Sequence, residues 1–351
     1  MREGWEYKKL GDLCDIYQPK TLATEQLVAD GKYYVYGANG IIGRYNDYNH
    51  EQSEILLTCR GATCGTINIS QPYSWINGNA MVIHRKSEDL SFDFLKYLML
   101  SLDYSLIITG AAQPQITRQK IAPILVKYPS LSVQQSIVSE LDKINELIRL
   151  KKEQLKDYDN LAQSIFYEMF GDPAVNDKNW KVMKLGEICR NCDNLRKPIT
   201  ASDRIPGSIP YYGASGIVDY VEDYIFSSDY LLVSEDGANL LARTTPIAFS
   251  ISGKTWVNNH AHVLEFKDSE TQLYVEYLIN SVDISNYITG AVQPKLNQAK
   301  LNVFPIPLPP HSLQQLFAQR IELIEQQKAE IQSTIADLET LLASRMQYWF
   351  D

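Results

Sequence analysis

Two polar loops at matching places in the chain carry side chains suited to binding nucleic acid. The first reads GAAQPQITRQKI at residues 110–121, and the second reads GAVQPKLNQAKL at residues 290–301. Gln and Asn can form paired hydrogen bonds with adenine, Arg can do so with guanine, and Lys neutralises phosphate. These residue types therefore favour contact with DNA, and the alternative is that Gln-Pro only closes a turn onto the next element.

Further polar loops supply the rest of the predicted DNA contacts. Gly110 and Gly290 would let the backbone approach a ligand closely, and the following Gln-Pro would stiffen each turn. In the first half the predicted DNA-contacting residues are Arg60, Thr63, Asn77, Asn79, Gln113, Gln115, Thr117, Arg118 and Lys120. In the second half they are Asn239, Arg243, Lys254, Asn258, Gln293, Lys295, Asn297 and Lys300.

Motifs of common catalytic sites are incomplete in this sequence. SISGKT (250–255) ends in Gly-Lys-Thr, but Ala248 stands where a phosphate-binding loop needs Gly, so we expect a turn between two strands. The chain contains no Gly-x-Gly-x-x-Gly, no His-Glu-x-x-His, and no Asn or Asp before the Pro-Pro of IPLPPHS (306–312). We predict no catalytic residue and no metal site.

Two pairs of titratable residues in the second half allow several interpretations. Glu235 and Asp236 follow a predicted strand and could hold a metal, accept a hydrogen bond from cytosine, or form a solvated turn. His260 and His262 flank Ala261 on a strand-like pattern. For the histidines we favour a half-exposed strand pair over DNA contacts.

Cysteine usage and composition place the protein in the cytoplasm. The five cysteines are an odd number, and Cys189-x-x-Cys192 has no second close pair at zinc-finger spacing, so free thiols are expected. No apolar run approaches 18 residues, and the start MREGWEYKKL lacks the apolar core of a signal peptide. The net charge is −9, with residues 1–132 neutral overall. Both long helical segments are acidic, which favours protein partners or solvated faces for them over DNA.

The sequence contains an internal repeat, and its two copies are offset by close to 180 residues. GWEYKKLGDLC (4–14) matches NWKVMKLGEIC (179–189), and DYSLIITGAAQP (103–114) matches DISNYITGAVQP (283–294). Each copy begins with short β-like runs, such as Ala80–His84 and Pro246–Ile251, followed by one helical stretch at 92–102 or 273–282. Each copy therefore predicts a small α+β domain whose loops bind the ligand.

A long helix follows each predicted domain. Both segments open with Ser-x-x-Gln after a proline, which predicts a capping box, and Gly171 and Pro173 end the first helix. The apolar positions step by 4 and 3 throughout, beginning Ile137, Leu141, Ile144 in one helix and Phe317, Ile321, Ile324 in the other. This heptad pattern favours a coiled coil of the two helices over two helices packed separately on their own domains.

The predicted fold class is α+β, with two similar mixed α/β domains, two long antiparallel coiled-coil helices and an internal pseudo-twofold repeat. The predicted domain boundaries are 1–131 and 173–311 for the globular domains, and 132–172 and 312–351 for the helices. Antiparallel pairing would place one globular domain at each end of a rod. Such a molecule would suit a target with two separated, similar sites, and duplex DNA is such a target.

In this order, the motifs resemble the specificity subunit of Type I restriction–modification systems. The resemblance covers essentially the whole chain. It rests on the two W-x-x-x-x-L-G starts at Trp5 and Trp180, the two ITGA-x-QP loops, and the Pro-rich segments before the S-x-QQ helices.

This resemblance implies a DNA-reading subunit without catalytic activity of its own. Two target recognition domains would each read one half of a split double-stranded DNA sequence, and the helices would set the gap between the halves. Two methyltransferase subunits would dock on the chain and methylate adenine, and restriction subunits can join and cleave DNA. S-adenosylmethionine, ATP and Mg²⁺ would belong to those partners, with no cofactor in this chain. The alternatives are a coiled-coil adaptor whose domains bind proteins and a nuclease or methyltransferase acting alone, which the missing motifs disfavour.

Overall fold

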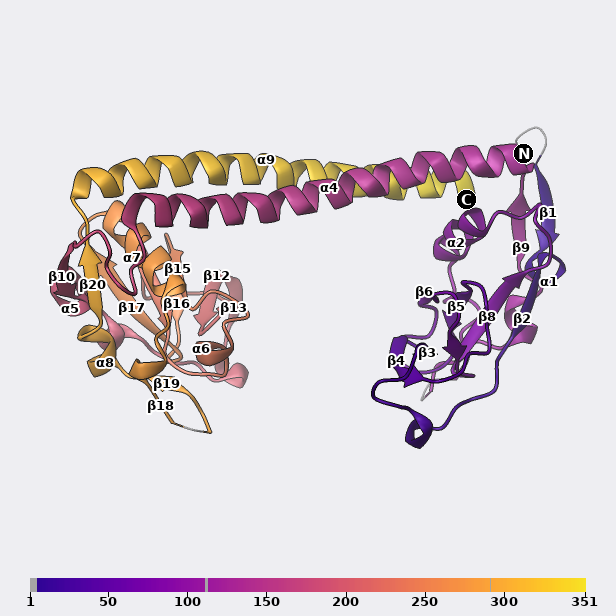
Figure 1. The fold of residues 1–351 in the computed structure, drawn as a ribbon, viewed down its shortest axis with the longest axis horizontal. Coiled ribbons are helices and arrows are strands. Elements are labelled where there is room, and N and C mark those ends of the chain that lie inside the picture. Colours follow the sequence, from indigo (N-terminus) through magenta and orange to yellow (C-terminus); the bar gives the residue numbers. More distant parts are fainter. Residues whose placement is uncertain (1–4, 111–112, 291) are drawn as a thin grey trace. The chain divides into compact units, whose positions relative to one another are not determined.

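The computed structural model describes residues 5–110, 113–290 and 292–351, which form two compact units. Unit 1 comprises Met1–Lys151 and Thr334–Asp351, and unit 2 comprises Lys152–Ser333. Each unit holds a globular body of strands and short helices together with parts of two long helices (Figure 1). The predicted α+β class is confirmed.

The body of unit 1 is built on a four-stranded antiparallel sheet in the order β2-β8-β5-β6. Its central strand β5 (Ile55–Thr58) is buried along its whole length, which is why it reads as a continuous apolar run. The other strands are β2 (Cys14–Tyr17), β8 (Ala80–Arg85), β6 (Ile67–Ile69), the three-stranded sheet β4 (Gly40–Tyr45), β3 (Tyr33–Gly37), β7 (Trp75–Ile76), and the pair β1 (Glu6–Lys9), β9 (Leu125–Tyr128). Its short helices are α1 (Leu10–Leu13), η1 (Thr24–Gln26), α2 (Phe92–Ser101) and α3 (Arg118–Ile121).

Unit 2 repeats the three sheets of unit 1 in the same strand order and has one further short pair of strands. Its four-stranded sheet runs β11 (Cys189–Asn191), β17 (Ala261–Phe266), β14 (Tyr230–Ser234), β15 (Ala248–Ile251). The remaining strands are β13 (Gly216–Val221), β12 (Pro206–Gly213), β16 (Trp256–Val257), the pair β10 (Lys181–Lys184), β20 (Pro305–Leu308), and the pair β18 (Ile288–Thr289), β19 (Lys295–Leu296). Its short helices are α5 (Leu185–Ile188), η2 (Asp193–Leu195), η3 (Ala201–Asp203), α6 (Asn239–Ala242), α7 (Ser269–Ser281), η4 (Ser285–Tyr287) and α8 (Gln298–Asn302). The predicted internal repeat is therefore confirmed, and strand register makes residues of the two units comparable one by one.

Some predicted elements differ from the observed ones at their ends. Helix α7 begins four residues earlier than predicted because the Asp268 carboxylate accepts a hydrogen bond from the Thr271 amide and caps it. The proline-rich segment before the second long helix, which its composition would suggest is an irregular linker, contains a strand: residues 305–308 form β20, which pairs with β10 in a two-stranded sheet. Proline is tolerated there because an edge strand leaves one side of its backbone without a partner strand.

The two long helices are α4 (Leu131–Phe170) and α9 (His311–Phe350). Each begins one residue before the predicted Ser N-cap, so Ser132 and Ser312 lie inside the helices. A buried glutamine instead anchors the N-terminus of each helix. The side chains of Gln134 and Gln314 each donate a hydrogen bond to the carbonyl of the proline five residues earlier. Gly171, with φ +76°, ends α4 as predicted.

The heptad positions of α4 and α9 form a buried seam inside each unit. In unit 1 the first part of α4 pairs with the last part of α9, and the Arg345 guanidinium contacts the Glu140 carboxylate. In unit 2 the last part of α4 pairs with the first part of α9, where Lys328 Nζ lies 2.8 Å from Asp159 Oδ1. The predicted antiparallel pairing is confirmed within each unit. Helices α2 and α7 lie between the long helices and the sheets, and their apolar side chains join the buried seam to the core of each unit (Figure 1).

No helix in the described parts of the chain combines the length and the apolar character that crossing a bilayer requires.

Candidate nucleic-acid interface

Loop 1, residues 109–120, is a short hairpin held against the end of β5. The Thr109 and Gln115 backbones exchange two hydrogen bonds of 2.9 and 2.8 Å. The Pro114 carbonyl accepts from the Gly61 amide at 3.0 Å, and the Ile116 amide donates to the carbonyl of Cys59. The backbone of loop 1 is therefore fixed at its base on the segment that carries Arg60. Its residues 111–112 lie outside the described part of the chain.

Loop 2, residues 289–300, has the same backbone scaffold in unit 2. The Pro294 carbonyl accepts from the Gly237 amide at 3.1 Å, and the Leu296 amide donates to the carbonyl of Glu235 at 2.8 Å. Gly290 has φ +87°, and Gly110 in loop 1 has φ +89°. A Cβ at either glycine would collide with the carbonyl oxygen three residues later. The glycine shared by the two loops is thus a requirement of this backbone.

The exposed side chains are partly shared and partly different between the loops. Gln113 and Gln293 are the same residue type, whereas Gln115 and Arg118 of loop 1 are replaced by Lys295 and Gln298 in loop 2. Lys120 of loop 1 is also exposed. Lys300 is half-buried, and its Nζ lies 3.5 Å from the Asn286 carbonyl. A common scaffold therefore presents different hydrogen-bonding groups and charges to the outside in the two units.

The tip of the β3–β4 hairpin joins this face in unit 1. Thr63 Oγ1 donates to Asn39 Oδ1 at 2.5 Å, and Thr58 Oγ1 contacts the Ala38 carbonyl. In unit 2 Ser234 Oγ makes the matching bond to the Ala214 carbonyl at 2.5 Å. Arg60, Thr63 and Asn79 are exposed, so unit 1 brings together these three and the residues of loop 1 at one end of its sheet.

Two of the predicted contact residues are buried and hold the backbone in place. Both amide groups of Asn77 are bonded to the backbone of Leu22, at 2.8 and 3.2 Å, and the residue is 4% exposed. Asn258 is 7% exposed, and its Oδ1 accepts from the His260 amide. Their hydrogen-bonding capacity is used inside each unit, which gives them a structural role.

Three more predicted contacts in unit 2 have structural partners. The Arg243 guanidinium donates to the carbonyls of Ile279 and Val282 at the C-terminus of α7, and burial lowers the pKa of this side chain. Asn239 bonds to the backbone of Thr245 through both its amide groups, and Asn297 caps α8 by accepting from the Lys300 amide at 3.0 Å.

Two of the predicted DNA-contacting residues take no part in the side-chain hydrogen bonds described above. Thr117 precedes α3 without a side-chain capping bond, and Lys254 is exposed with its Nζ over the Tyr224 ring. Lys254 stands in the turn between β15 and β16, which confirms that SISGKT is a turn between strands.

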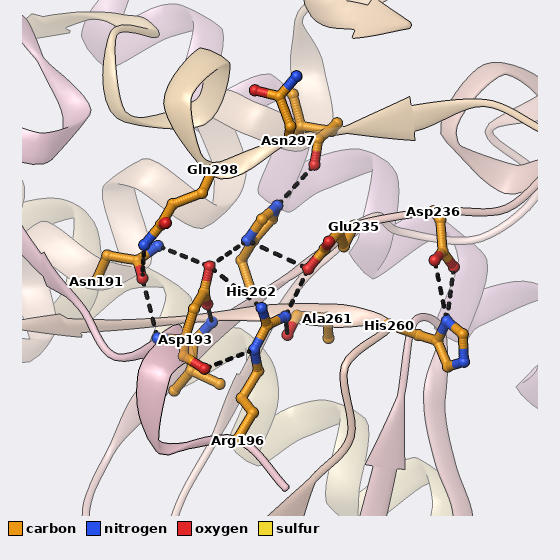
Figure 2. A network of polar contacts seen from close by, with 12 residues as sticks. Asn191, Asp193, Arg196, Glu235, Asp236, His260, Ala261, His262, Asn297 and Gln298 are labelled. Carbon is orange, nitrogen blue, oxygen red and sulfur yellow. Dashed lines mark hydrogen bonds and ion pairs between the residues drawn. The ribbon is translucent and has the colours of Figure 1, made fainter. Parts of the chain in front are cut away.

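Beneath loop 2 lies a cluster of charged side chains, shown in Figure 2. We define the charged cluster as Asp193, Arg196, Glu235 and His262. His262 Nδ1 lies 2.6 Å from Asp193 Oδ2, and its Nε2 lies 2.7 Å from the Leu296 carbonyl oxygen. Arg196 Nη1 donates to Glu235 Oε2 at 2.6 Å and to the Ala261 carbonyl at 2.6 Å. The cluster therefore connects η2, β14 and β17 to the base of loop 2.

Electrostatics inside the cluster keep both acids ionised. Burial raises the pKa of the Asp193 carboxyl, but hydrogen bonding and charge from His262 outweigh it, so the pKa is lowered overall. Burial likewise opposes ionisation of Glu235, and the hydrogen bonds from Arg196 and Lys295 overcome it and lower the pKa of that carboxyl. His262 is therefore the main stabilising partner of the Asp193 carboxylate, and Arg196 is the main stabilising partner of the Glu235 carboxylate.

This geometry corrects two expectations for unit 2. Glu235 was considered as part of a solvated turn, but its side chain is 12% exposed and is bonded to Arg196. His262 was expected in a half-exposed pair, but its side chain is 1% exposed, whereas His260 is exposed and bonds to Asp236. The alternation of side chains along the strand correctly places Ala261 on the face opposite to His262. That alternation could not show that loop 2 covers His262.

A metal ion does not fit the charged cluster. Asp193, Glu235 and His262 offer ligand atoms within 4.8 Å of one another. However, both acids already bond to Arg196, and both ring nitrogens of His262 face oxygen acceptors. A divalent cation would have to displace the guanidinium, so the arrangement is an ion-pair network.

The same position in unit 1 is neutral. Strand register pairs Leu57 with Met81 in unit 1 and Val233 with His262 in unit 2, so Met81 matches His262 and Cys59 matches Glu235. Gln18, one residue beyond β2, matches Asp193 and donates to the Cys59 sulfur at 3.0 Å. All five cysteines are free, as predicted. Sequence analysis did not predict the cluster because its members lie far apart in the sequence. The change from uncharged residues in the first repeat to titratable residues in the second at these three positions could have indicated it.

Comparison with known proteins identifies a family model that covers most of the chain and relatives that match part of it. A family model described as the Type I restriction modification DNA specificity domain matches residues 2–157 and 177–339. A putative type I restriction enzyme specificity subunit of Haemophilus influenzae is 37% identical over 139 residues, which are 40% of this chain and 35% of that protein. A putative type I specificity subunit of Mycoplasma pneumoniae is 25% identical over 192 residues, 52% of this chain and 51% of that protein. The chain thus spans between about a third and a half of the length of these two relatives.

Solved structures share the fold over nearly the full chain. A crystal structure of the S subunit of a Type I restriction–modification system from M. genitalium superposes with a TM-score of 0.58 at 15% identity, covering 99% of this chain and 96% of that one. A chain described in connection with complex assembly and conformational transition of the type I R-M system gives a TM-score of 0.61 at 17% identity, covering 99% and 97%.

Proposed function

The chain belongs to the family of Type I restriction–modification DNA specificity domains, and from this premise we propose that it reads a split sequence in double-stranded DNA. Unit 1 and unit 2 would each read one half of that sequence. The observation that carries the proposal is the identical backbone scaffold of loop 1 and loop 2 beneath different exposed side chains. A shared scaffold with variable side chains is what two readers of two different half-sites require.

The proposed contact residues are those that the structure leaves exposed at these faces, together with the half-buried Lys300. In unit 1 they are Arg60, Thr63, Asn79, Gln113, Gln115, Arg118 and Lys120, and in unit 2 they are Gln293, Lys295, Gln298 and Lys300. Unit 1 offers three cations in this set. In unit 2 the charge of Lys295 is offset by Glu235, so phosphate attraction is weaker at this half-site.

The proposal extends to partners by way of the family resemblance. Methyltransferase subunits would dock on the chain, and S-adenosylmethionine, ATP and Mg²⁺ would act on those subunits and on restriction subunits in the cytoplasm, with no catalytic step in this chain. The acidic α4 and α9 support a docking face for protein partners, since their exposed surfaces do not suit DNA. A coiled-coil adaptor without DNA specificity is the alternative, and membership of a DNA specificity family disfavours it.

Two lysine substitutions test the DNA-facing loops. Lys120→Ala and Lys300→Ala should each weaken binding of the assembled complex to all DNA sequences and flatten the plot of log binding constant against log salt by up to about one unit. Lys267→Ala is the matched control, because Lys267 is exposed just beyond the far end of β17 from loop 2. Equal salt slopes for the two loop variants and the control would remove the loops from the interface.

The half-site assignment is tested by exchanging unit bodies. Replacing residues 173–311 with the same region of another family member should change one half of the methylated sequence, read by long-read sequencing of genomic DNA. A change in both halves would contradict separate reading by the two units.

The role of the helices as a spacer is tested by length. Adding seven residues to each of α4 and α9 preserves the heptad seam and lengthens each helix by about 10 Å. At roughly 3.4 Å per base pair, the gap between half-sites should grow by about three base pairs. A gap of unchanged length would show that the helices do not set it.

A further inference from the structure

We propose that the charged cluster of unit 2 is a positioning device that orients Lys295 and Gln298 for recognition of one half-site. The inference rests on the proposed function and adds residues that contact no DNA themselves. Unit 1 has no matching charges at Gln18, Cys59 and Met81, so the device would act in one half of the target only.

The cluster fixes the backbone of loop 2 through His262. Both ring nitrogens of His262 face acceptors, the Asp193 carboxylate on one side and the Leu296 carbonyl on the other. An ionised carboxylate and a carbonyl can only accept, so the ring donates both bonds when both of its nitrogens carry hydrogen. Leu296 follows Lys295 directly, so a buried charged bond holds the backbone next to a predicted DNA contact (Figure 2).

The cluster also holds the side chains that face outward. Lys295 Nζ lies 3.1 Å from Glu235 Oε1, while Glu235 is itself held by Arg196. Gln298 Nε2 donates to Asn191 Oδ1 at 2.6 Å, and Asn191 Nδ2 donates to Asp193 Oδ2 at 3.1 Å. Two exposed side chains from different parts of loop 2 therefore both end on the same buried network.

Such tethering changes what Lys295 contributes to DNA binding. A free lysine attracts any phosphate, whereas a lysine held by a carboxylate has less charge to offer and a restricted direction in which to donate. Ordering the side chain before binding also lowers the entropy that binding must overcome. The cluster should therefore reduce sequence-independent attraction and favour the correct bases in the half-site of unit 2.

The test replaces Glu235 by Gln, which removes one charge while keeping the size and an acceptor for Arg196. Binding is measured by fluorescence anisotropy of the assembled complex on three DNAs: the intact target, the target with the unit 2 half-site scrambled, and the target with the unit 1 half-site scrambled. We expect E235Q to lower discrimination at the unit 2 half-site by about tenfold, the low end of one side-chain-to-base contact. We also expect a salt slope steeper by up to about one unit, because Lys295 is released to phosphate.

The matched control is Glu265→Gln. Glu265 is in the same unit, on β17, and pairs with Arg190 away from the cluster, so this variant makes the same change in net charge. Adding Lys295→Ala to E235Q should restore the wild-type salt slope, an effect that loss of stability alone would not produce. Discrimination at the unit 1 half-site should not change in any of these variants.

The outcomes separate the two claims. If wild-type complex shows no preference for the intact target over either scrambled DNA, the proposed function fails. If it shows that preference but E235Q matches E265Q in both slope and discrimination, the positioning device is refuted and the proposed function stands.

Discussion

Replacing His262 by Met is the sharpest test of the buried charges, because Met is the residue that unit 1 holds at this position. The substitution removes the two contacts of the His262 ring, of 2.6 and 2.7 Å, and leaves the Asp193 carboxylate with Arg196 alone as a charged partner. Each bond to a charged group contributes about 1.5–3 kcal/mol. Asp193 keeps the Val263 amide and Asn191 as donors, which limits the loss. We expect unit 2 to lose about 3–5 kcal/mol, as for other broken buried pairs.

Hydrogen exchange measures this loss at one amide. The Leu296 amide bonds to the Glu235 carbonyl in unit 2, and the Ile116 amide makes the matching bond to the Cys59 carbonyl in unit 1. A loss of about 3–5 kcal/mol should speed exchange at Leu296 by roughly 10² to 10⁴ and leave Ile116 unchanged.

A double variant shows whether unpaired charge is the cause. Asp193→Gln added to His262→Met copies the neutral pair of unit 1 and should recover most of the protection at Leu296, since neutral side chains can replace a buried ion pair at little cost. Unchanged exchange at Leu296 in His262→Met, or equal change at Leu296 and Ile116, would refute the reasoning.

Three further predictions concern loop geometry, helix pairing and pH. Gly290→Ala should destabilise loop 2 by about 1–2 kcal/mol from its φ of +87° alone and by more from the collision with the Gln293 carbonyl; Gly253→Ala, with φ +71° and open space around it, measures the φ contribution by itself in the same thermal unfolding assay. Arg345→Met should lower the stability of unit 1 only slightly, because solvent screens the pair that Arg345 forms with the one-third exposed Glu140; an unchanged urea midpoint for unit 1 would contradict this. The lowered pKa values of Asp193 and Glu235 contribute stability that is present above the pKa of unfolded carboxyls, about 4, and is lost as pH falls through the lower folded values; urea midpoints between pH 6 and pH 3 should therefore fall less in Asp193→Asn than in the unsubstituted chain.

Helices and strands with strong local patterns were predicted well from the sequence. The 4-and-3 spacing from Ile137 in α4 and from Phe317 in α9 specified both long helices to within a residue or two of the observed ends. Strand β8 was expected at Ala80–His84 and ends one residue later. These elements depend on the periodicity of neighbouring residues, which a sequence displays directly.

Individual side chains at the interface were predicted less well. The polar type of Asn77, Arg243 and Asn297 suggested DNA contacts, but each bonds to nearby backbone. Polar residues in loops serve both purposes, and only the positions of carbonyls and amides in space distinguish them.

What the sequence determined by itself was the repeat, the two helical seams and the special backbone of the two loops, because each depends on residues close together in the chain or on the unusual properties of Gly and Pro. Only the tertiary structure decided that Asp193, Glu235 and His262 meet beneath loop 2. They come from three elements separated by 27 or more positions, and it is the pairing of β14 with β17 and the folding of η2 against them that brings their charges within hydrogen-bonding distance. Long-range pairing of this kind follows from the packing of the whole unit, and local spacing carries no record of it.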